Sequence, residues 1–170
     1  MEVAGSSPAR PTKIKNNMAN IFLDQQLMQE VITNKSDNSS TLSSQFFIDF
    51  INVIEGWKTK CKNLHWAAPK KNIHVYLDEF LAILSDYQDS IAEDYQGILG
   101  QMQPNAVKGT PSETLNAIDL IKEVADKTRE FYLSIPEETA FVGIKSETET
   151  FIHNIYKYTY LFRLTDVRPY

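Results

Sequence analysis

The sequence contains little of what disulfide-rich, β-sheet and membrane-spanning proteins depend on. It has one cysteine and six glycines among 170 residues, and no segment alternates Val, Ile or Thr with polar residues. The single cysteine, Cys61, excludes an internal disulfide and fits a reducing compartment, and its apolar helical setting predicts a buried, unreactive thiol. No apolar run is long enough to cross a membrane, and the N-terminus lacks the apolar core of a secretory signal. We therefore expect an all-α protein in the cytoplasm, with no membrane partner.

Length and charge further limit the number of domains and the kinds of partner that we expect. A chain of this length is one domain by prior, and its formal net charge of −5 argues against a broad basic surface for nucleic acid. Residues 1–20 mix Ser, Pro, Asn and cations without periodicity, so we expect a disordered arm before a folded domain over 21–170. Within that arm, Arg10, Lys13 and Lys15 either form a small phosphate-binding group or belong to a plain unstructured extension.

Four long segments carry apolar residues at the spacing of an α-helix. We expect helices over residues 40–66, 73–101, 110–133 and 134–164, and a short helix over 21–32. The residues predicted to face inward are Phe46, Phe50, Ile54, Trp57, Cys61, Leu64, Phe80, Leu84, Tyr87, Ile91, Ile98, Leu115, Ile118, Ile121, Val124, Ala125, Phe151, Ile155, Tyr158 and Phe162. Four long helices with short connections predict an antiparallel four-helix bundle.

Local signals indicate where these helices begin and end. Pro69 breaks the chain between the first two helices, and residues 103–109 are a predicted loop. Thr110-Pro111-Ser112-Glu113 combines an N-cap, a first-turn proline and a capping-box acid, so the third helix is predicted to begin there. Ser134-Ile-Pro136-Glu137 repeats this signal for the fourth helix, in which we expect a kink near Gly143.

One pattern predicts chemistry rather than packing. On a single helix, His74, Asp78, Asp89 and Glu93 point within about 100° of each other, yet His74 and Glu93 stand about 28 Å apart along its axis. One chain therefore cannot bring all four side chains to one ion. The residue numbers of His74 and Glu93 sum to 167, and so do those of Asp78 and Asp89. An antiparallel partner helix, related by a two-fold axis near residues 83–84, would build two identical His/carboxylate sites.

His65 extends this constellation from the end of the first helix. It precedes His74 by nine residues, so the intervening turn can bring the two imidazoles together. Imidazole and carboxylate together suit Fe²⁺, and a mixed site leaves open positions for an oxidant. Ala82 and Ser85, on the same face, would let two helices approach closely. The alternative for each residue alone is a solvated acid or a histidine in a polar contact, which is also what we expect of His153.

The residues that carry these ligands resemble a known family. Asn63-Leu64-His65-Trp66, the His74/Asp78 pair and Asp89-Ser-Ile-Ala-Glu93 resemble the signature of the Dps proteins (DNA-binding proteins from starved cells), or mini-ferritins. The resemblance is specific over residues 46–96 and limited to helix pattern over 110–164.

The resemblance implies a ferritin-like bundle that assembles from two-fold dimers into a dodecameric iron-storage shell. Each dimer would hold two ferroxidase sites that oxidise Fe²⁺ with peroxide or oxygen and so protect against peroxide stress. His65, His74 and Asp78 would come from one subunit, and Asp89 and Glu93 from the other. Trp66 would either donate electrons beside the iron or simply pack in the core.

The chain also departs from the family pattern. The turn before His74 is shorter than usual, Asp94 stands where Arg is expected, and the connection between the second and third bundle helices is cut to about 103–109. No lysine-rich tail is present, so DNA binding is weakly supported. A non-catalytic ferritin-like bundle with a vestigial metal site is the alternative function, and a nucleic-acid condenser is a weaker third.

Overall fold

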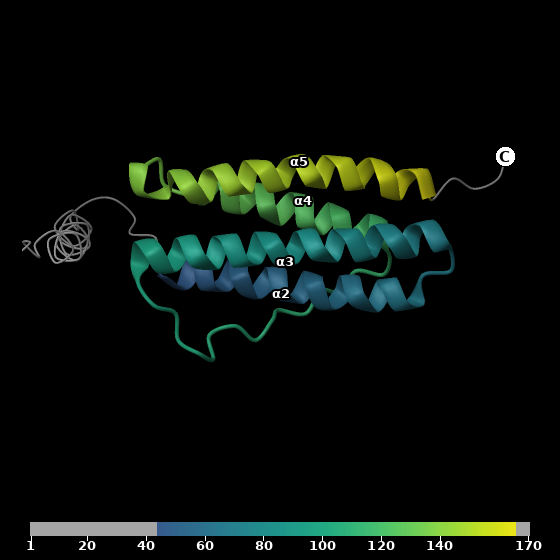
Figure 1. Ribbon diagram of the computed structural model, residues 1–170, viewed down its shortest axis with the longest axis horizontal. Coiled ribbons are helices and arrows are strands. Elements are labelled where there is room, and N and C mark those ends of the chain that lie inside the picture. The colour runs from purple at the N-terminus through teal and green to yellow at the C-terminus, as the bar shows by residue number, and fades with distance from the viewer. Residues whose placement is uncertain (1–43, 166–170) are drawn as a thin grey trace, which may run out of the picture. The chain divides into compact units, whose positions relative to one another are not determined.

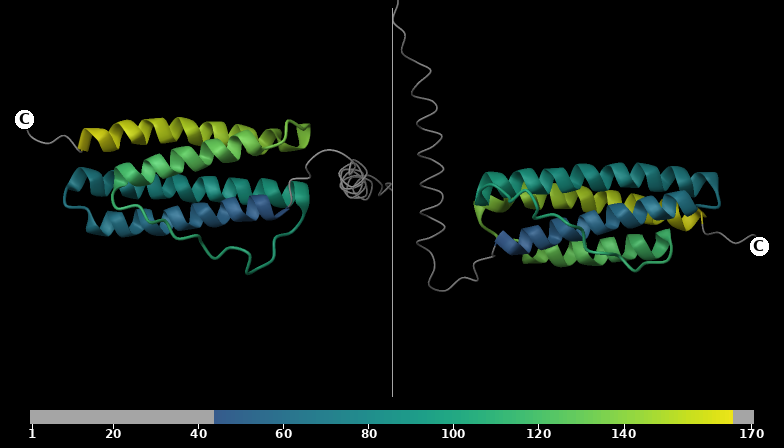
Figure 2. Two further views of the ribbon diagram at one scale, coloured as in Figure 1. Left: turned by 180° about the vertical axis from the view of Figure 1, so that it is seen from behind. Right: turned by 90° about the horizontal axis from the view of Figure 1, so that it is seen from below.

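The computed structural model describes residues 44–165, which form four long helices and one short 3₁₀ helix (Figure 1). The helices are α2 (Ser44–Ala67), α3 (Lys71–Leu99), α4 (Ala117–Ser134) and α5 (Val142–Thr165), with η1 (Thr139–Phe141) before α5. Helix α2 packs against α3 and α4, and α5 packs against the same two helices, as the views in Figure 2 agree. The described residues contain no strand, which confirms the all-α prediction.

The remaining predictions about the N-terminal part fall outside the described residues. These are the arm over 1–20, the domain boundary after it and the short helix over 21–32. None of the described helices is both long and apolar enough to cross a membrane.

The predicted apolar stripes form one core between the four helices. The ring of Phe50 stacks on Phe131 at 3.7 Å between centroids, and Tyr87 stacks on Phe151 at 3.9 Å. Each large side chain of this kind stabilises the fold by roughly 1.5–3 kcal/mol relative to an exposed one. Phe47 belongs to the same core although the predicted stripe omits it, because a helix between two neighbours buries a wider face than a single i,i+4 row.

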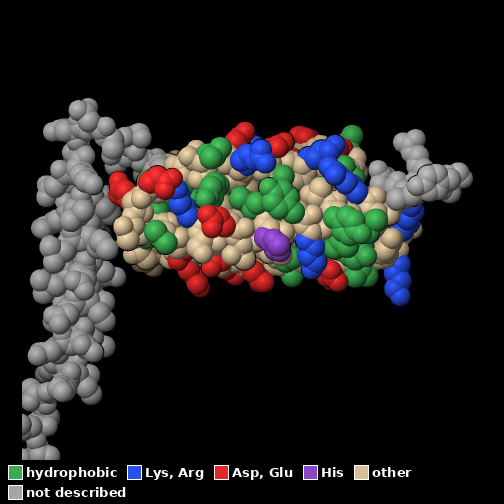
Figure 3. All heavy atoms as spheres, turned by 90° about the horizontal axis from the view of Figure 1, so that it is seen from above, with side chains coloured by type: hydrophobic (Ala, Val, Ile, Leu, Met, Phe, Trp, Pro, Cys, Tyr) green, Lys and Arg blue, Asp and Glu red, His purple; other side chains and the backbone are tan. Residues whose placement is uncertain are grey.

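The surface mixes side chains of different kinds. In Figure 3, acidic, basic and apolar side chains are interspersed on the face that is shown, and the apolar ones lie in several separate places. Tyr156, Tyr160 and Leu164 are among the large exposed apolar residues, all on α5.

The third helix begins seven positions later than predicted, and the connection before it is correspondingly longer, over residues 100–116. Asn116 is the N-cap of α4, and its side-chain oxygen accepts a hydrogen bond from Asp119 N at 2.9 Å. The hydroxyl of Ser112 bonds to Glu123 Oε2 instead of capping a helix. Leu115, which was predicted to face inward, is 85 % exposed.

Asn52 of α2 explains why the connection is not helical. Its side-chain oxygen accepts hydrogen bonds from Lys108 N at 2.7 Å and Gly109 N at 3.0 Å, and its amide donates to Ala106 O. The backbone oxygen of Asn52 accepts from Thr110 N at 2.8 Å. These tertiary bonds satisfy backbone groups in an extended course, so the local capping signal at 110–113 does not start a helix.

The fourth helix also begins later than predicted, at Val142. Ile135 N bonds to Phe131 O and so completes the end of α4, while Ile135 itself is extended, as expected for a residue before proline. The chain then forms η1 with Phe141 buried in the core. The change from 3₁₀ to α geometry at Val142 therefore replaces the kink that was expected at Gly143.

The close approach of the connection to α2 yields a stability prediction. A Cβ on Gly56 would collide with the backbone oxygen of Thr110, whereas a Cβ on Gly97 of α3 would meet nothing within 4 Å. We expect Gly56→Ala to lower the free energy of unfolding by about 1–3 kcal/mol, because the rigid connection must move. The control Gly97→Ala should raise it by roughly 0.5–1 kcal/mol through helix propensity. Urea unfolding followed by circular dichroism measures both, and equal effects would contradict the observed contact.

Candidate functional site

The two histidines at the junction of α2 and α3 are in direct contact. His65 lies in the last turn of α2 and His74 in the first turn of α3, and their rings stack with centroids 3.8 Å apart. Pro69, in the turn between the helices, prevents α2 from continuing and lets the chain return. His65 is buried and His74 is exposed. The prediction that this turn brings the two imidazoles together is confirmed.

Each imidazole is also fixed by a hydrogen bond to the other residue's backbone. His65 Nδ1 lies 3.0 Å from His74 O, and His74 Nδ1 lies 3.0 Å from His65 O. A carbonyl oxygen only accepts hydrogen bonds, so a neutral ring making this bond carries its proton on Nδ1. Both Nε2 atoms then keep a lone pair. An imidazole that ligates a metal through one nitrogen and donates its other N–H to a carbonyl is the usual arrangement in metal sites.

Asp78 lies next to this pair, one turn further along α3. Its Oδ1 is 3.7 Å from His65 Nδ1, and its side chain is 59 % exposed. Lys62 lies beside this carboxylate: its ammonium is 3.5 Å from the same oxygen and 5.9 Å above the ring of Trp66. Sequence reasoning missed Lys62, although its position three residues before His65 and four before Trp66 places it on the same helix face.

The other two predicted ligands lie far along α3 within the same chain. Because α3 is one continuous helix, Glu93 stands about 28 Å from His74 along its axis. Asp89, Glu93, His74 and Asp78 are all exposed, and Ala82 between them is exposed as well. In the single chain, residues 44–165 contain no group of three or more His, Cys, Asp or Glu side chains that could hold a metal ion. The structure brings together His65, His74 and Asp78 and leaves Asp89 and Glu93 apart from them.

Trp66 and Cys61 complete the neighbourhood. Trp66 is 70 % exposed, so the interpretation that it packs in the core of this chain is wrong. Cys61 is fully buried and its thiol donates to Leu77 O at 3.2 Å. Burial raises the pKa of Cys61 to about 12, so the thiol stays protonated and is neither a nucleophile nor a ready metal ligand.

No family model, curated protein or solved structure matches this chain. Within residues 44–165, the stacked histidines and the neighbouring Asp78 do not by themselves form a group that could hold a metal ion.

The histidine tautomers give a direct test of this geometry. In neutral imidazole, we expect both His65 and His74 to carry the proton on Nδ1, because each Nδ1 faces a carbonyl oxygen. Long-range ¹⁵N–¹H correlation spectra of the labelled protein distinguish the two tautomers, and exposed His153 on α5 provides an internal reference. An Nε2–H pattern for either ring would contradict the reciprocal bonds and would leave no free Nε2 on that ring.

Proposed function

We propose that this protein is a Dps-like ferroxidase and iron-storage protein of the cytoplasm, with iron-oxidising sites shared between two copies of the chain. One copy contributes His65, His74 and Asp78 to each site, and the other contributes Asp89 and Glu93. The observation that carries the proposal is the stacked histidine pair, since its reciprocal carbonyl bonds leave two Nε2 atoms available on neighbouring rings.

The spacing of the four candidate ligands along α3 supports a shared site. In an antiparallel, ferritin-like pairing of two α3 helices about an axis near residues 83–84, His74 lies level with the other copy's Glu93, and Asp78 with Asp89. The face involved is exposed in the single chain, and Ala82 at its centre leaves room for close contact. Such a dimer has two sites, and dimers of this kind would be the units of a larger hollow assembly.

The proposed chemistry is the oxidation of Fe²⁺, which is the substrate. One peroxide molecule accepts one electron from each of two Fe²⁺ ions, takes up two protons and leaves as two waters. The carboxylates stabilise the increased charge of Fe³⁺, because hard oxygen donors favour the higher oxidation state, while the imidazoles hold the ion in place. Trp66 is exposed and follows His65 in the chain, and it would donate an electron when only one Fe²⁺ is bound.

One observation favours a second function. The ammonium of Lys62 already partners Asp78 at 3.5 Å, so the carboxylate is compensated without any metal. A non-catalytic bundle that uses this face only for contact with another copy would need no more than that. The two functions differ in a measurable property. A ferroxidase oxidises Fe²⁺ and loses this activity when the histidines are removed, whereas a non-catalytic bundle does not oxidise Fe²⁺ with or without them.

Complementation between two inactive variants tests the shared site. His65→Ala/His74→Ala removes one half of every site and Asp89→Ala/Glu93→Ala removes the other, so each variant should lose rapid Fe²⁺ oxidation with peroxide. After subunit exchange, activity should return to about one quarter of wild type, because half of the dimers are mixed and each has one intact site of two. Absorbance of the ferric product measures the rate.

The matched control is Asp126→Ala/Glu130→Ala on α4, which removes two exposed acids at the same spacing. Alone, it should keep wild-type activity. Mixed with either inactive variant, it should give only the activity expected from its own share of the chains. No recovery despite demonstrated exchange would mean that no site is shared between chains. A wild-type protein without peroxide-dependent oxidation would favour the non-catalytic bundle.

A further inference from the structure

A separate pocket lies between α2 and the connection over residues 100–116. It has a volume of about 240 Å³ and is lined on one side by Thr59, Lys60 and Asn63 of α2. On the other side, the residues of the connection from Lys108 to Ser112 line it. The size is just below the range typical of drug-sized ligand sites, so the pocket suits a small polar molecule.

The pocket is positively charged. Among the described residues that line it, only Lys60 and Lys108 are ionisable, and neither makes an ion pair with a described residue. Two acids adjoin the wall and have other partners: Glu55 lies beside Gly109 and pairs with Lys58 at 3.0 Å, and Glu123 accepts from Trp57 Nε1 and from the lining residue Ser112. Among the described residues, two lysines and no Asp or Glu therefore line this small space, in a chain whose net charge is −5.

The walls of the pocket are fixed before any ligand arrives. Four hydrogen bonds join Asn52 to the segment 106–110, and the backbone of Thr110 sits directly against Gly56. Gly109 adopts a φ of 81°, which turns the chain beside Glu55 and suits glycine. A pocket held in this way loses little conformational entropy when it binds.

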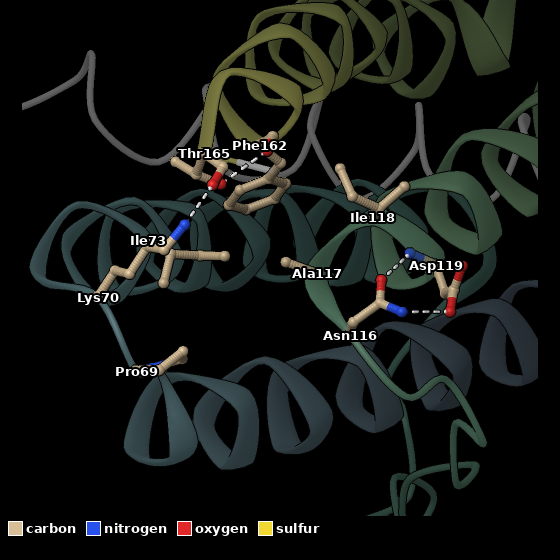
Figure 4. Close-up of a pocket in the computed structure, with 9 residues that line it drawn as sticks. All are labelled: Pro69, Lys70, Ile73, Asn116, Ala117, Ile118, Asp119, Phe162 and Thr165. Atoms are coloured by element: carbon tan, nitrogen blue, oxygen red, sulfur yellow. Dashed lines mark hydrogen bonds between the residues drawn. The ribbon is translucent and has the colours of Figure 1, made fainter. Parts of the chain in front are cut away.

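The larger pocket at the end of the bundle differs in this respect. It has a volume of about 390 Å³ and contains one lysine, Lys70, whose ammonium donates to Thr165 O at 3.2 Å (Figure 4). Asn116 in the same pocket caps α4, and Asp119 beside it adds a negative charge. Lys70 and Asn116 therefore take part in hydrogen bonds that stabilise the fold, whereas Lys60 and Lys108 of the smaller pocket have no ion-pair partner among the described residues.

We propose that the pocket over Lys60 and Lys108 binds a phosphoryl group, either as inorganic phosphate or as the phosphate of a small monoester. The two ammonium groups supply the charge for a dianion, and the hydroxyl of Thr59 and the amide of Asn63 supply neutral donors. The proposal goes beyond the iron chemistry above and does not rest on it, since none of these residues belongs to the shared site.

Titration of the full chain with inorganic phosphate and with ribose 5-phosphate tests the inference. Isothermal calorimetry should show saturable binding that weakens with added NaCl, and Lys60→Gln/Lys108→Gln should weaken it by about tenfold or more. The control Lys122→Gln/Lys127→Gln removes two exposed lysines of α4 and should change binding little. Lys60→Arg/Lys108→Arg, which keeps both charges, should retain most of it.

A measurement on the unchanged protein guards against variants that misfold. In ¹H–¹⁵N spectra, phosphate should shift the backbone amides of Thr59, Asn63 and Ser112 more than those of α5. Tighter binding of ribose 5-phosphate would identify the monoester as the ligand, and tighter binding of inorganic phosphate would identify the free ion. No saturable binding of either, or binding that the glutamine variants leave unchanged, would overturn the proposal.

Discussion

The reciprocal hydrogen bonds between the two histidines and the backbone fix the junction of α2 and α3. The carbonyl of His65 is one of the last of α2, which have no partner within the helix, and it accepts from His74 Nδ1 and Ala68 N. This use of Nδ1 orients both rings and sets which nitrogens remain free. Further bonds continue the interface away from the junction, from Cys61 Sγ to Leu77 O and from Gln88 Nε2 to Ile51 O.

The same rigidity explains why the proposed site needs a second chain. A continuous α3 holds Glu93 too far from His74 for one ion, and its exposed ligand face cannot fold back on itself. Lys62 pairs with Asp78 and would compete with an arriving cation for that carboxylate. Iron binding by the proposed dimer would therefore have to displace an exposed ion pair, which costs little because such pairs contribute about 0–1 kcal/mol.

Much of the fold could be predicted from the sequence, because the information was local. The i,i+4 rows through Phe50 and Tyr87 are buried as expected, and Pro69 separates two helices. The start of α4 could not be predicted, since its reason is tertiary: Asn52 binds the segment that carries the capping signal.

The same distinction between local and tertiary information applies to the candidate site. Helical spacing was enough to place His74, Asp78, Asp89 and Glu93 on one face of α3. The stacking and tautomers of the histidines depend on the geometry of the turn, which residue spacing does not encode. Lys62 was missed because its role comes from a contact across two helices, with Asp78.

We propose that two α3 helices pair antiparallel about an axis near residues 83–84, and distances between spin labels test this pairing most directly. Asp86→Cys and Gly97→Cys place labels on exposed positions beside the ligand face, and buried Cys61 should not react. For this pairing, the axial separation between equivalent labels is about 8 Å at position 86 and about 40 Å at position 97, at 1.5 Å rise per residue. Pulsed electron paramagnetic resonance should therefore give a much longer distance at 97 than at 86. Equal distances at the two positions, or no coupling between chains at either, would contradict this pairing.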